Sequence, residues 1–176
     1  FHASPLFNGN TEMADFKNLD GKQLFNQTYD ASRWQAAATA AKEAIDIAEA
    51  NGKSLYKVAD ADPFKSAFLS SRNLYWDGWK TEGIWIRPSS NRSQWEVHAA
   101  PRAIAGTAYN GFAVLQEVVD DFRMNNGLDI SQSNSYTESG FTAESTDYYV
   151  AQTSNMYVGR EPRFYAFVTF NGSMIP

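Results

Sequence analysis

The most regular apolar pattern in the chain predicts a helix over residues 32–51. Its apolar positions recur every three or four residues, the spacing that gathers side chains on one helix face, and they are Trp34, Ala38, Ala41, Ile45 and Ala48. Ser32 and Gln35 fit a capping box at its start, and Gly52 offers the left-handed residue that ends many helices. An Ala-rich face allows a neighbouring helix to approach closely, as in tetratricopeptide-like helix pairs, although no repeat of that type is visible.

Two further segments predict helices from the same kind of spacing. One starts at Asp62-Pro63, and the other covers residues 112–126 and ends before Gly127. The positions that define their inner faces are Phe64, Phe68 and Leu69 in the first, and Leu115, Val118, Val119 and Phe122 in the second. The fold class is therefore expected to be mainly α.

The rest of the chain predicts loops and a few short strands. Residues 72–111 lose the helical period and contain Gly and Pro, which indicates a long aromatic loop region with short strands, one of them at 94–98. Residues 131–155 are rich in Ser and Thr and predict a polar loop. Residues 164–170 alternate as in a strand, and Asn171-Gly172 predicts a turn after it.

Composition adds one unusual feature, a high content of aromatic residues. The 176 residues are 43% hydrophobic and 20% charged, which suits a globular core, but 15% of them are Phe, Trp or Tyr. This surplus has two readings, a surface that binds flat partners such as sugar rings, or an aromatic-rich core. The formal net charge of −5, without basic runs, argues against nucleic-acid binding. The chain has no cysteine, which excludes disulfides and thiolate metal sites.

The aromatic loop region supplies the residues that we select as a candidate carbohydrate-binding set. Trp76 and Trp79 flank the Asp77-Gly78 turn, an arrangement that would present both rings from one exposed tip. The other members of the set are Tyr75, Trp85, Arg87, Asn91 and Tyr109. Two isoleucines flank Trp85, which favours a core position for that ring. The neighbouring polar side chains would contact sugar hydroxyls.

Charged residues near the C-terminus predict a structural role. Arg160, Glu161 and Arg163 indicate a buried ion-pair network that holds a helix start against a sheet, in preference to a catalytic or anion-binding cluster. Arg33 has the same expected role, as a helix-start residue paired with a carboxylate.

The sequence contains few residues that could carry out catalysis. The only histidines are His2 and His98, so neither a Ser-His-Asp triad nor a histidine metal site is expected. Glycoside hydrolysis needs two facing carboxylates, and although Asp77, Glu82 and Glu96 lie near the aromatic region, nothing marks two of them as a pair. Motifs for nucleotide phosphates or calcium are also absent. We predict no catalytic residue, no metal and no cofactor.

Six short motifs, in order, resemble those of the SusD/RagB family and span nearly the whole chain. They are Ala3-Ser4-Pro5-Leu6-Phe7-Asn8-Gly9, the Arg33-Trp34 helix with Ala37, Ala38, Ala41, Lys42, Ala44 and Ile45, Leu55-Tyr56, Trp95-Glu96-Val97, Val118-Val119-Asp120-Asp121-Phe122, and Arg160-Glu161-Pro162-Arg163-Phe164-Tyr165. Each is weak alone, and their order makes the set specific. Two departures, Ala113 in place of a frequent proline and a short stretch at 98–111, fall in a variable loop. Arg33, Trp34 and Asp120 thus join the framework residues.

The resemblance implies a SusD-like fold, with tetratricopeptide-like helix pairs, long irregular loops and a few short strands. It also implies a non-catalytic lipoprotein of the bacterial outer membrane that faces outward and captures glycan for a SusC-like TonB-dependent transporter. In this family the glycan contacts lie on variable loops, so no motif identifies them here. The alternatives are a helical protein-interaction scaffold, a peptide-binding family member and, with less support, a glycoside hydrolase.

The same resemblance leads us to interpret residues 1–176 as part of a single SusD-like domain, truncated at both ends. Family members are several times longer and begin with a lipidated cysteine. Residues 1–10 resemble the tail of a helix, and the Asn171-Gly172 turn is followed by only four residues. The signal peptide and the lipid anchor are expected outside this chain.

Overall fold

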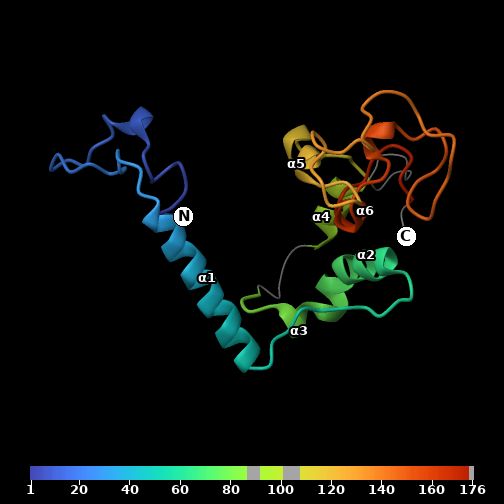
Figure 1. Ribbon diagram of the computed structural model, residues 1–176, viewed down its shortest axis with the longest axis horizontal. Coiled ribbons are helices and arrows are strands. Elements are labelled where there is room, and N and C mark those ends of the chain that lie inside the picture. Colours follow the sequence, from blue (N-terminus) through green and yellow to red (C-terminus); the bar gives the residue numbers. More distant parts are fainter. Residues whose placement is uncertain (87–91, 101–107, 175–176) are drawn as a thin grey trace. The chain divides into compact units, whose positions relative to one another are not determined.

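The computed structural model describes residues 1–86, 92–100 and 108–174, and within them the fold is mainly helical (Figure 1). Strand pairing in these residues is limited to isolated bridges. The expectation of a mainly α fold is confirmed, whereas tetratricopeptide-like pairing of the helices stays a prediction. The chain divides into two compact units, Phe1–Ser54 and Leu55–Pro176.

The first unit contains α1, Ser32–Ala50, which confirms the longest predicted helix. Its start differs from the predicted capping box, because the Asp30 carboxylate accepts from the Ser32 backbone N–H at 2.9 Å and from its hydroxyl at 2.6 Å. These hydrogen bonds lower the pKa of Asp30, the side-chain bond from Ser32 most of all. Gly52 lies at φ +81° just past the helix, as a left-handed terminator should.

No residue of α1 is buried within its unit. Trp34 on the predicted apolar face is 51% exposed, and Ile45 is equally open. Helices of this length gain most of their stability from packing. The residues of its own unit therefore contribute little packing to stabilise α1.

The segment before α1 is not the tail of a helix, so that prediction is wrong. Residues 1–10 form turns, and the chain reverses at Gly9 with φ +84°. Asn8 is buried and exchanges two hydrogen bonds with the backbone of Asp30, at 2.8 and 2.9 Å. Arg33 donates to the carbonyl oxygens of Phe7 and His2, at 3.0 and 3.2 Å, in place of the expected carboxylate. The short 3-10 helix η1, Thr11–Met13, follows.

The first helix of the second unit is α2, Pro63–Asn73, which starts where Asp62-Pro63 predicted it. The Asp62 carboxylate caps it by accepting from the backbone N–H of Phe64 at 2.9 Å. Phe68 is its buried residue, and Ser66 and Ser70 on the helix tie down the extended chain before it through Val58.

The aromatic loop region predicted at 72–111 is largely helical where the structure describes it. The chain continues from α2 through η2, a five-residue π-helical turn at Leu74–Gly78, into α3, Trp79–Glu82. Gly78 is buried against Tyr56, and a Cβ atom there would overlap the tyrosine ring. The glycine therefore permits close packing of a helix, whereas the sequence pattern suggested a turn.

Three further elements, from residue 92 onward, differ from their predictions. The strand expected at 94–98 is the helix α4, Arg92–Ala99, and the helix expected at 112–126 is confined to α5, Gln116–Asp121. The strand expected at 164–170 is instead the helix α6, Pro162–Phe167, followed by extended chain. The proline occupies the first helical turn, where its missing N–H has no cost, and Phe164 and Val168 are buried one helical turn apart.

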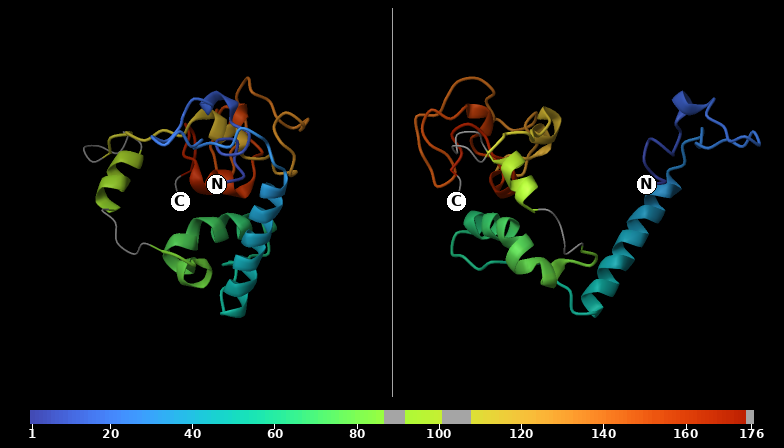
Figure 2. Two further views of the ribbon diagram at one scale, coloured as in Figure 1. Left: turned by 90° about the vertical axis from the view of Figure 1, so that its left-hand side faces the viewer. Right: turned by 180° about the vertical axis from the view of Figure 1, so that it is seen from behind.

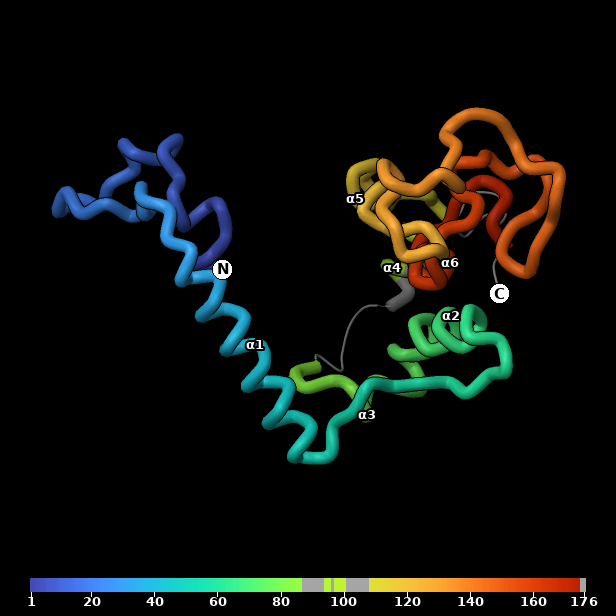
Figure 3. Tube along the Cα trace, in the orientation of Figure 1, coloured from blue at the N-terminus to red at the C-terminus, as the bar shows by residue number. Residues whose placement is uncertain are grey.

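The core of the second unit forms around α5 and α6. Val119, Phe164 and Val168 are its buried members, and Phe122, Tyr157, Tyr165 and Phe170 pack against them. The helix α2 lies against α6, as the views of Figures 1 and 2 also show. Residues 131–154 contain no helix, which confirms the predicted polar loop, and Figure 3 shows this loop as a long irregular trace. The 3-10 helix η3, Asn155–Tyr157, ends it.

Arg160 is 1% exposed and is held by carbonyl oxygens instead of the expected ion pair. Its guanidinium donates to Val119, to Phe122 at 2.9 Å and to Met156 at 3.0 Å. The Phe164 ring lies 5.0 Å from the guanidinium carbon. The ion pair of the region is the neighbouring Arg163–Glu161 contact at 2.8 Å, on the surface side.

Candidate functional site

The predicted tip that would present Trp76 and Trp79 together does not exist, because Asp77 and Gly78 are helical. Trp76 is nevertheless 65% exposed and its neighbour Tyr75 is more exposed still, so both rings are open to a ligand. Trp79 is half-buried at the start of α3, with the Lys80 ammonium 5.7 Å from its ring.

The other members of the predicted set are spread over different segments. Trp85 is 97% exposed, so the core position that its isoleucine neighbours favoured is wrong. Arg87 and Asn91 lie outside the described residues. Tyr109 is exposed and belongs to a separate group of rings.

That group, which we call the α4 aromatic cluster, consists of Trp95, His98, Tyr109 and Phe112. The Trp95 and Phe112 rings are 5.0 Å apart, the His98 and Tyr109 rings 5.3 Å, and the His98 and Phe112 rings 5.5 Å. Trp95 is 64% exposed, and Tyr109 and Phe112 are about half exposed. The cluster therefore presents aromatic surface to solvent, which is the apolar contact that sugar rings use.

Backbone contacts hold the cluster together. The Tyr109 N–H donates to the Val97 carbonyl at 2.6 Å, and the Gly111 and Phe112 N–H groups both donate to the His98 carbonyl. Gly111 is needed at this crossing, because a Cβ atom would lie 2.7 Å from His98 Nδ1. The segment carrying Tyr109 and Phe112 is thereby fixed against α4.

A groove of about 750 Å³ adjoins this cluster, with Phe112 common to both. Its volume falls within the ~300–1,000 Å³ that small-molecule sites occupy. The described lining carries no charged side chain, and its polar members bear amides or hydroxyls: Asn110, Gln116, Thr169, Asn171, Ser173 and Tyr157. Amides and hydroxyls both donate and accept hydrogen bonds, so the groove suits a neutral ligand rich in hydroxyl groups.

The backbone of Asn110 adopts an uncommon conformation beside the groove. It lies at φ +48°, a left-handed conformation that Asn adopts more readily than most residues. Its N–H donates to the Ala100 carbonyl at 3.1 Å. Non-glycine residues held in this region often mark functional sites.

The sequence named Tyr109 but missed Trp95, Phe112 and the groove. The available signal was the spacing of Trp95 and His98, three residues apart, which places both on one face once 94–98 is read as a helix. The groove itself joins segments far apart in the sequence, and no local pattern reports such an arrangement.

Features of other chemistries are not found in the described part of the chain. No group of three or more His, Cys, Asp or Glu is placed to hold a metal ion there, and no described helix combines the length and apolarity that a membrane crossing requires. Of the carboxylates near the aromatic region, Glu82 accepts from the Tyr56 backbone N–H at 3.0 Å, a structural contact.

The sequence profile of the SusD family matches residues 64–175. The match covers α2 through α6, including the α4 aromatic cluster and the groove, and it exceeds half of the chain. The chain therefore belongs to the SusD family. No curated protein matches it.

Proposed function

We propose that the chain is the glycan-binding part of a nutrient-uptake protein and that it acts by capture, without catalysis. Family membership supports this role in general terms. The observation that carries the proposal is the uncharged groove beside the α4 aromatic cluster, because it joins flat apolar rings to amide and hydroxyl groups.

Sugar rings would stack on the exposed rings of the cluster, while the polar groove residues bond their hydroxyls. A bound glycan chain that touches several such rings gains by multivalency, so that weak contacts add. The exposed rings of Tyr75, Trp76 and Trp85 offer further contacts of this kind, with Trp79, Arg87 and Asn91 as the remaining candidates from the sequence.

The test is affinity electrophoresis of the chain through gels that contain neutral polysaccharides. We expect retardation by at least one glycan, with no release of reducing sugar on incubation. Trp95→Ala should weaken binding by roughly 1–3 kcal/mol, the usual worth of burying an apolar side chain. The matched control is Trp34→Ala, which removes another exposed tryptophan, 51% exposed against 64% for Trp95, from α1 and should leave retardation unchanged.

A companion substitution tests the rings that the sequence singled out. Trp76→Ala should weaken retardation by a comparable roughly 1–3 kcal/mol if that ring contacts the glycan. If Trp76→Ala binds like the wild type while Trp95→Ala fails, the binding surface is confined to the α4 aromatic cluster and its groove.

The setting that we propose for this activity is the outer face of the bacterial outer membrane. There the protein would be held by a lipid anchor, and it would deliver glycan to a SusC-like TonB-dependent transporter. Co-purification of the full-length protein with such a transporter from outer-membrane extracts would support this setting.

One observation favours a second candidate, a scaffold that binds only protein. One face of α1 carries exposed Trp34 and Ile45, which is unusual for a helix without a binding partner. If no glycan in a broad panel retards the chain, this scaffold role, or peptide binding, replaces glycan capture.

A further inference from the structure

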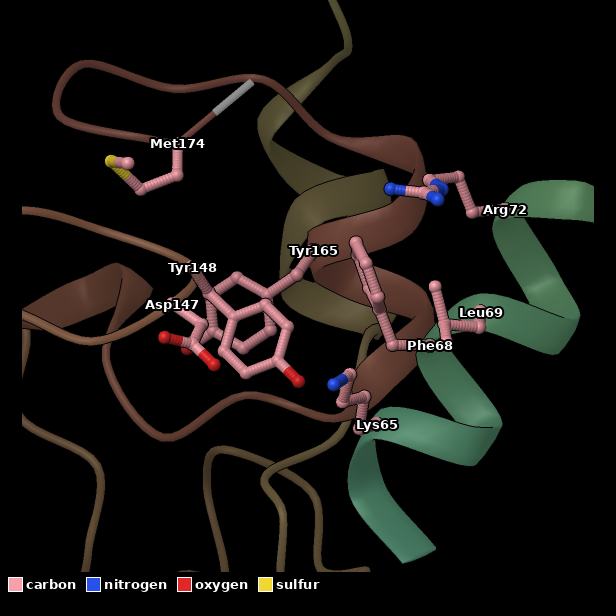
Figure 4. Close-up of a pocket in the computed structure, with 8 residues that line it drawn as sticks. All are labelled: Lys65, Phe68, Leu69, Arg72, Asp147, Tyr148, Tyr165 and Met174. Carbon is pink, nitrogen blue, oxygen red and sulfur yellow. The ribbon is translucent and has the colours of Figure 1, made fainter. Parts of the chain in front are cut away.

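A second cavity lies in the same unit, at a different place from the groove. It has a volume of about 140 Å³ and forms where α2 meets the polar loop and α6. Figure 4 shows Lys65 and Phe68 of α2 directed toward Tyr148 of the loop, with Arg72 beside the Phe68 ring and Asp147 on the opposite side of Tyr148.

Aromatic rings make one wall of this cavity. Tyr148 stacks on Tyr165 with ring centroids 5.2 Å apart and meets the buried Phe68 edge-on at 5.0 Å. Tyr165 is fixed in turn, because its hydroxyl donates to the Tyr157 carbonyl at 2.7 Å. The half-buried Tyr148 ring is therefore held in place before any ligand arrives.

Positively and negatively charged side chains surround this wall. Lys65 contacts Asp60 only at 3.6 Å and stays half exposed. Arg72 donates from Nε to Asn73 at 2.9 Å, and its guanidinium carbon lies 5.5 Å from the centroid of the Phe68 ring. Its two terminal amino groups donate to no acceptor among the described residues. The exposed Asp147 carboxylate makes no ion pair or hydrogen bond with the residues that the structure describes.

Two cations and one carboxylate line the cavity: Lys65 and Arg72 of α2, and Asp147 of the loop. Neutral hydroxyls can accept from Lys65 and Arg72 and donate to Asp147. A carboxylate or phosphate ligand has only acceptors, so it would leave Asp147 without a donor and facing a like charge. Burial is the main reason that the pKa of Tyr148 is raised, and Asp62, Asp147 and Asp60 add to the shift.

We propose that this cavity is a separate site for one neutral pyranose residue, either a free monosaccharide or the end of a glycan chain. The inference rests on the proposed glycan-binding function and adds to it a ligand class and a second location. The volume supports a single ring, since it is well below the ~300–1,000 Å³ of sites for larger molecules. The aromatic wall would contact the C–H face of the ring, and Lys65, Arg72 and Asp147 would bind its hydroxyls.

The test is titration of the ¹⁵N-labelled chain with neutral methyl pyranosides (glucoside, galactoside, mannoside and xyloside), followed by NMR, with methyl glucuronide as the acidic comparison. We expect at least one neutral glycoside to shift the amide signals of Asp147 and Tyr148. Asp147→Asn should weaken that binding about tenfold, because hydrogen bonds to charged groups are worth about 1.5–3 kcal/mol. The exposed Glu144 lies on the same loop, so Glu144→Gln is the matched control and should bind as the wild type.

These outcomes distinguish failure of the cavity proposal from failure of the glycan-binding function on which it rests. If polysaccharide is retarded but no neutral glycoside shifts the Asp147 and Tyr148 signals, the cavity proposal is wrong and glycan capture stands. A preference for the glucuronide, or equal binding by Asp147→Asn, also overturns the proposal. If neither polysaccharide nor glycoside binds, both proposals fall together. Binding at the cavity that survives Trp95→Ala shows that the two sites are separate.

Discussion

Arg160 shows how one buried side chain can organise the core of the second unit. Its donors reach carbonyl oxygens of α5, of the chain just after α5 and of η3. Carbonyls at the end of a helix lack partners within it, and this guanidinium supplies them from another segment. The sequence predicted a buried structural role for Arg160 but gave it carboxylate partners, because a sequence pattern cannot distinguish a distant carbonyl from a nearby acid.

Substitution of Arg160 is therefore expected to be costly. Arg160→Met removes the donor of three buried or partly buried carbonyl oxygens and should lower the free energy of unfolding by roughly 3–5 kcal/mol, measured by urea denaturation. Arg163→Gln is the control from the same turn, since its surface pair with Glu161 should contribute less than about 1 kcal/mol. Equal losses in the two variants would contradict a special role for Arg160.

Tyr165 predicts a loss of stability at high pH. Burial is the main cause that raises its pKa well above the ordinary value of 10.0. The folded state then keeps a proton that the unfolded state releases, so the stability from this group is complete below pH 10 and declines as the pH rises above it. Thermal unfolding between pH 9 and about 11 should show this decline. In Tyr165→Phe the loss of stability with rising pH should be smaller. It should not vanish, because the pKa values of Tyr136 and Tyr148 are also raised.

At the scale of helices and strands, the reliable predictions were the two with a recognisable start as well as an apolar period, since the segment 112–126 had a period and a terminating Gly127 but only Gln116–Asp121 is helical. α1 and α2 have long apolar periods and clear caps or terminators, and both formed where expected. The errors at α4 and α6 concern segments of six to eight residues, for which alternation and helical spacing are hard to tell apart. Their helical state depends on the rings they meet, which the local sequence does not contain.

Two glycines of the second unit provide a matched test of turn geometry. Gly127 and Gly172 both have positive φ, +81° and +93°, but only at Gly172 would a Cβ atom overlap Thr153 Oγ1, while Gly127 has open space. Gly127→Ala should lower the free energy of unfolding by roughly 1 kcal/mol from backbone strain alone. Gly172→Ala should cost roughly 1–3 kcal/mol more because of the steric overlap. Denaturation curves that show the same loss for both would contradict this geometry.

At the scale of the whole chain, the two units differ in how much they bury. The second unit has a core around Val119, Phe164 and Val168, whereas the first buries only Ala3 and Asn8. Both interpretations of the aromatic surplus therefore hold in part, since some rings fill the core and others stay exposed. Composition predicted the surplus, and only the spatial arrangement separates the two groups.

Hydrogen exchange should report this difference. The hydrogen bonds of α1 lie on a helix that its own unit does not cover, so its amides should exchange by local opening. The Val168 N–H, which donates to the Phe164 carbonyl at 2.9 Å in the core, should be protected at least about tenfold more strongly. Equal protection of α1 would show that another surface covers this helix in solution.

The π-helical turn η2 has a consequence for how such a protein can diverge. Its wider turn holds an extra residue between α2 and α3, and turns of this type are frequent at functional sites. A π-helical turn accommodates one additional residue within a helix by winding more widely. Removal of one codon within Leu74–Gly78 would therefore restore ordinary helical winding and leave the faces of α2 and α3 nearly aligned as before. Single-codon insertions and deletions can thus be absorbed at this turn while the Trp79 ring keeps its direction.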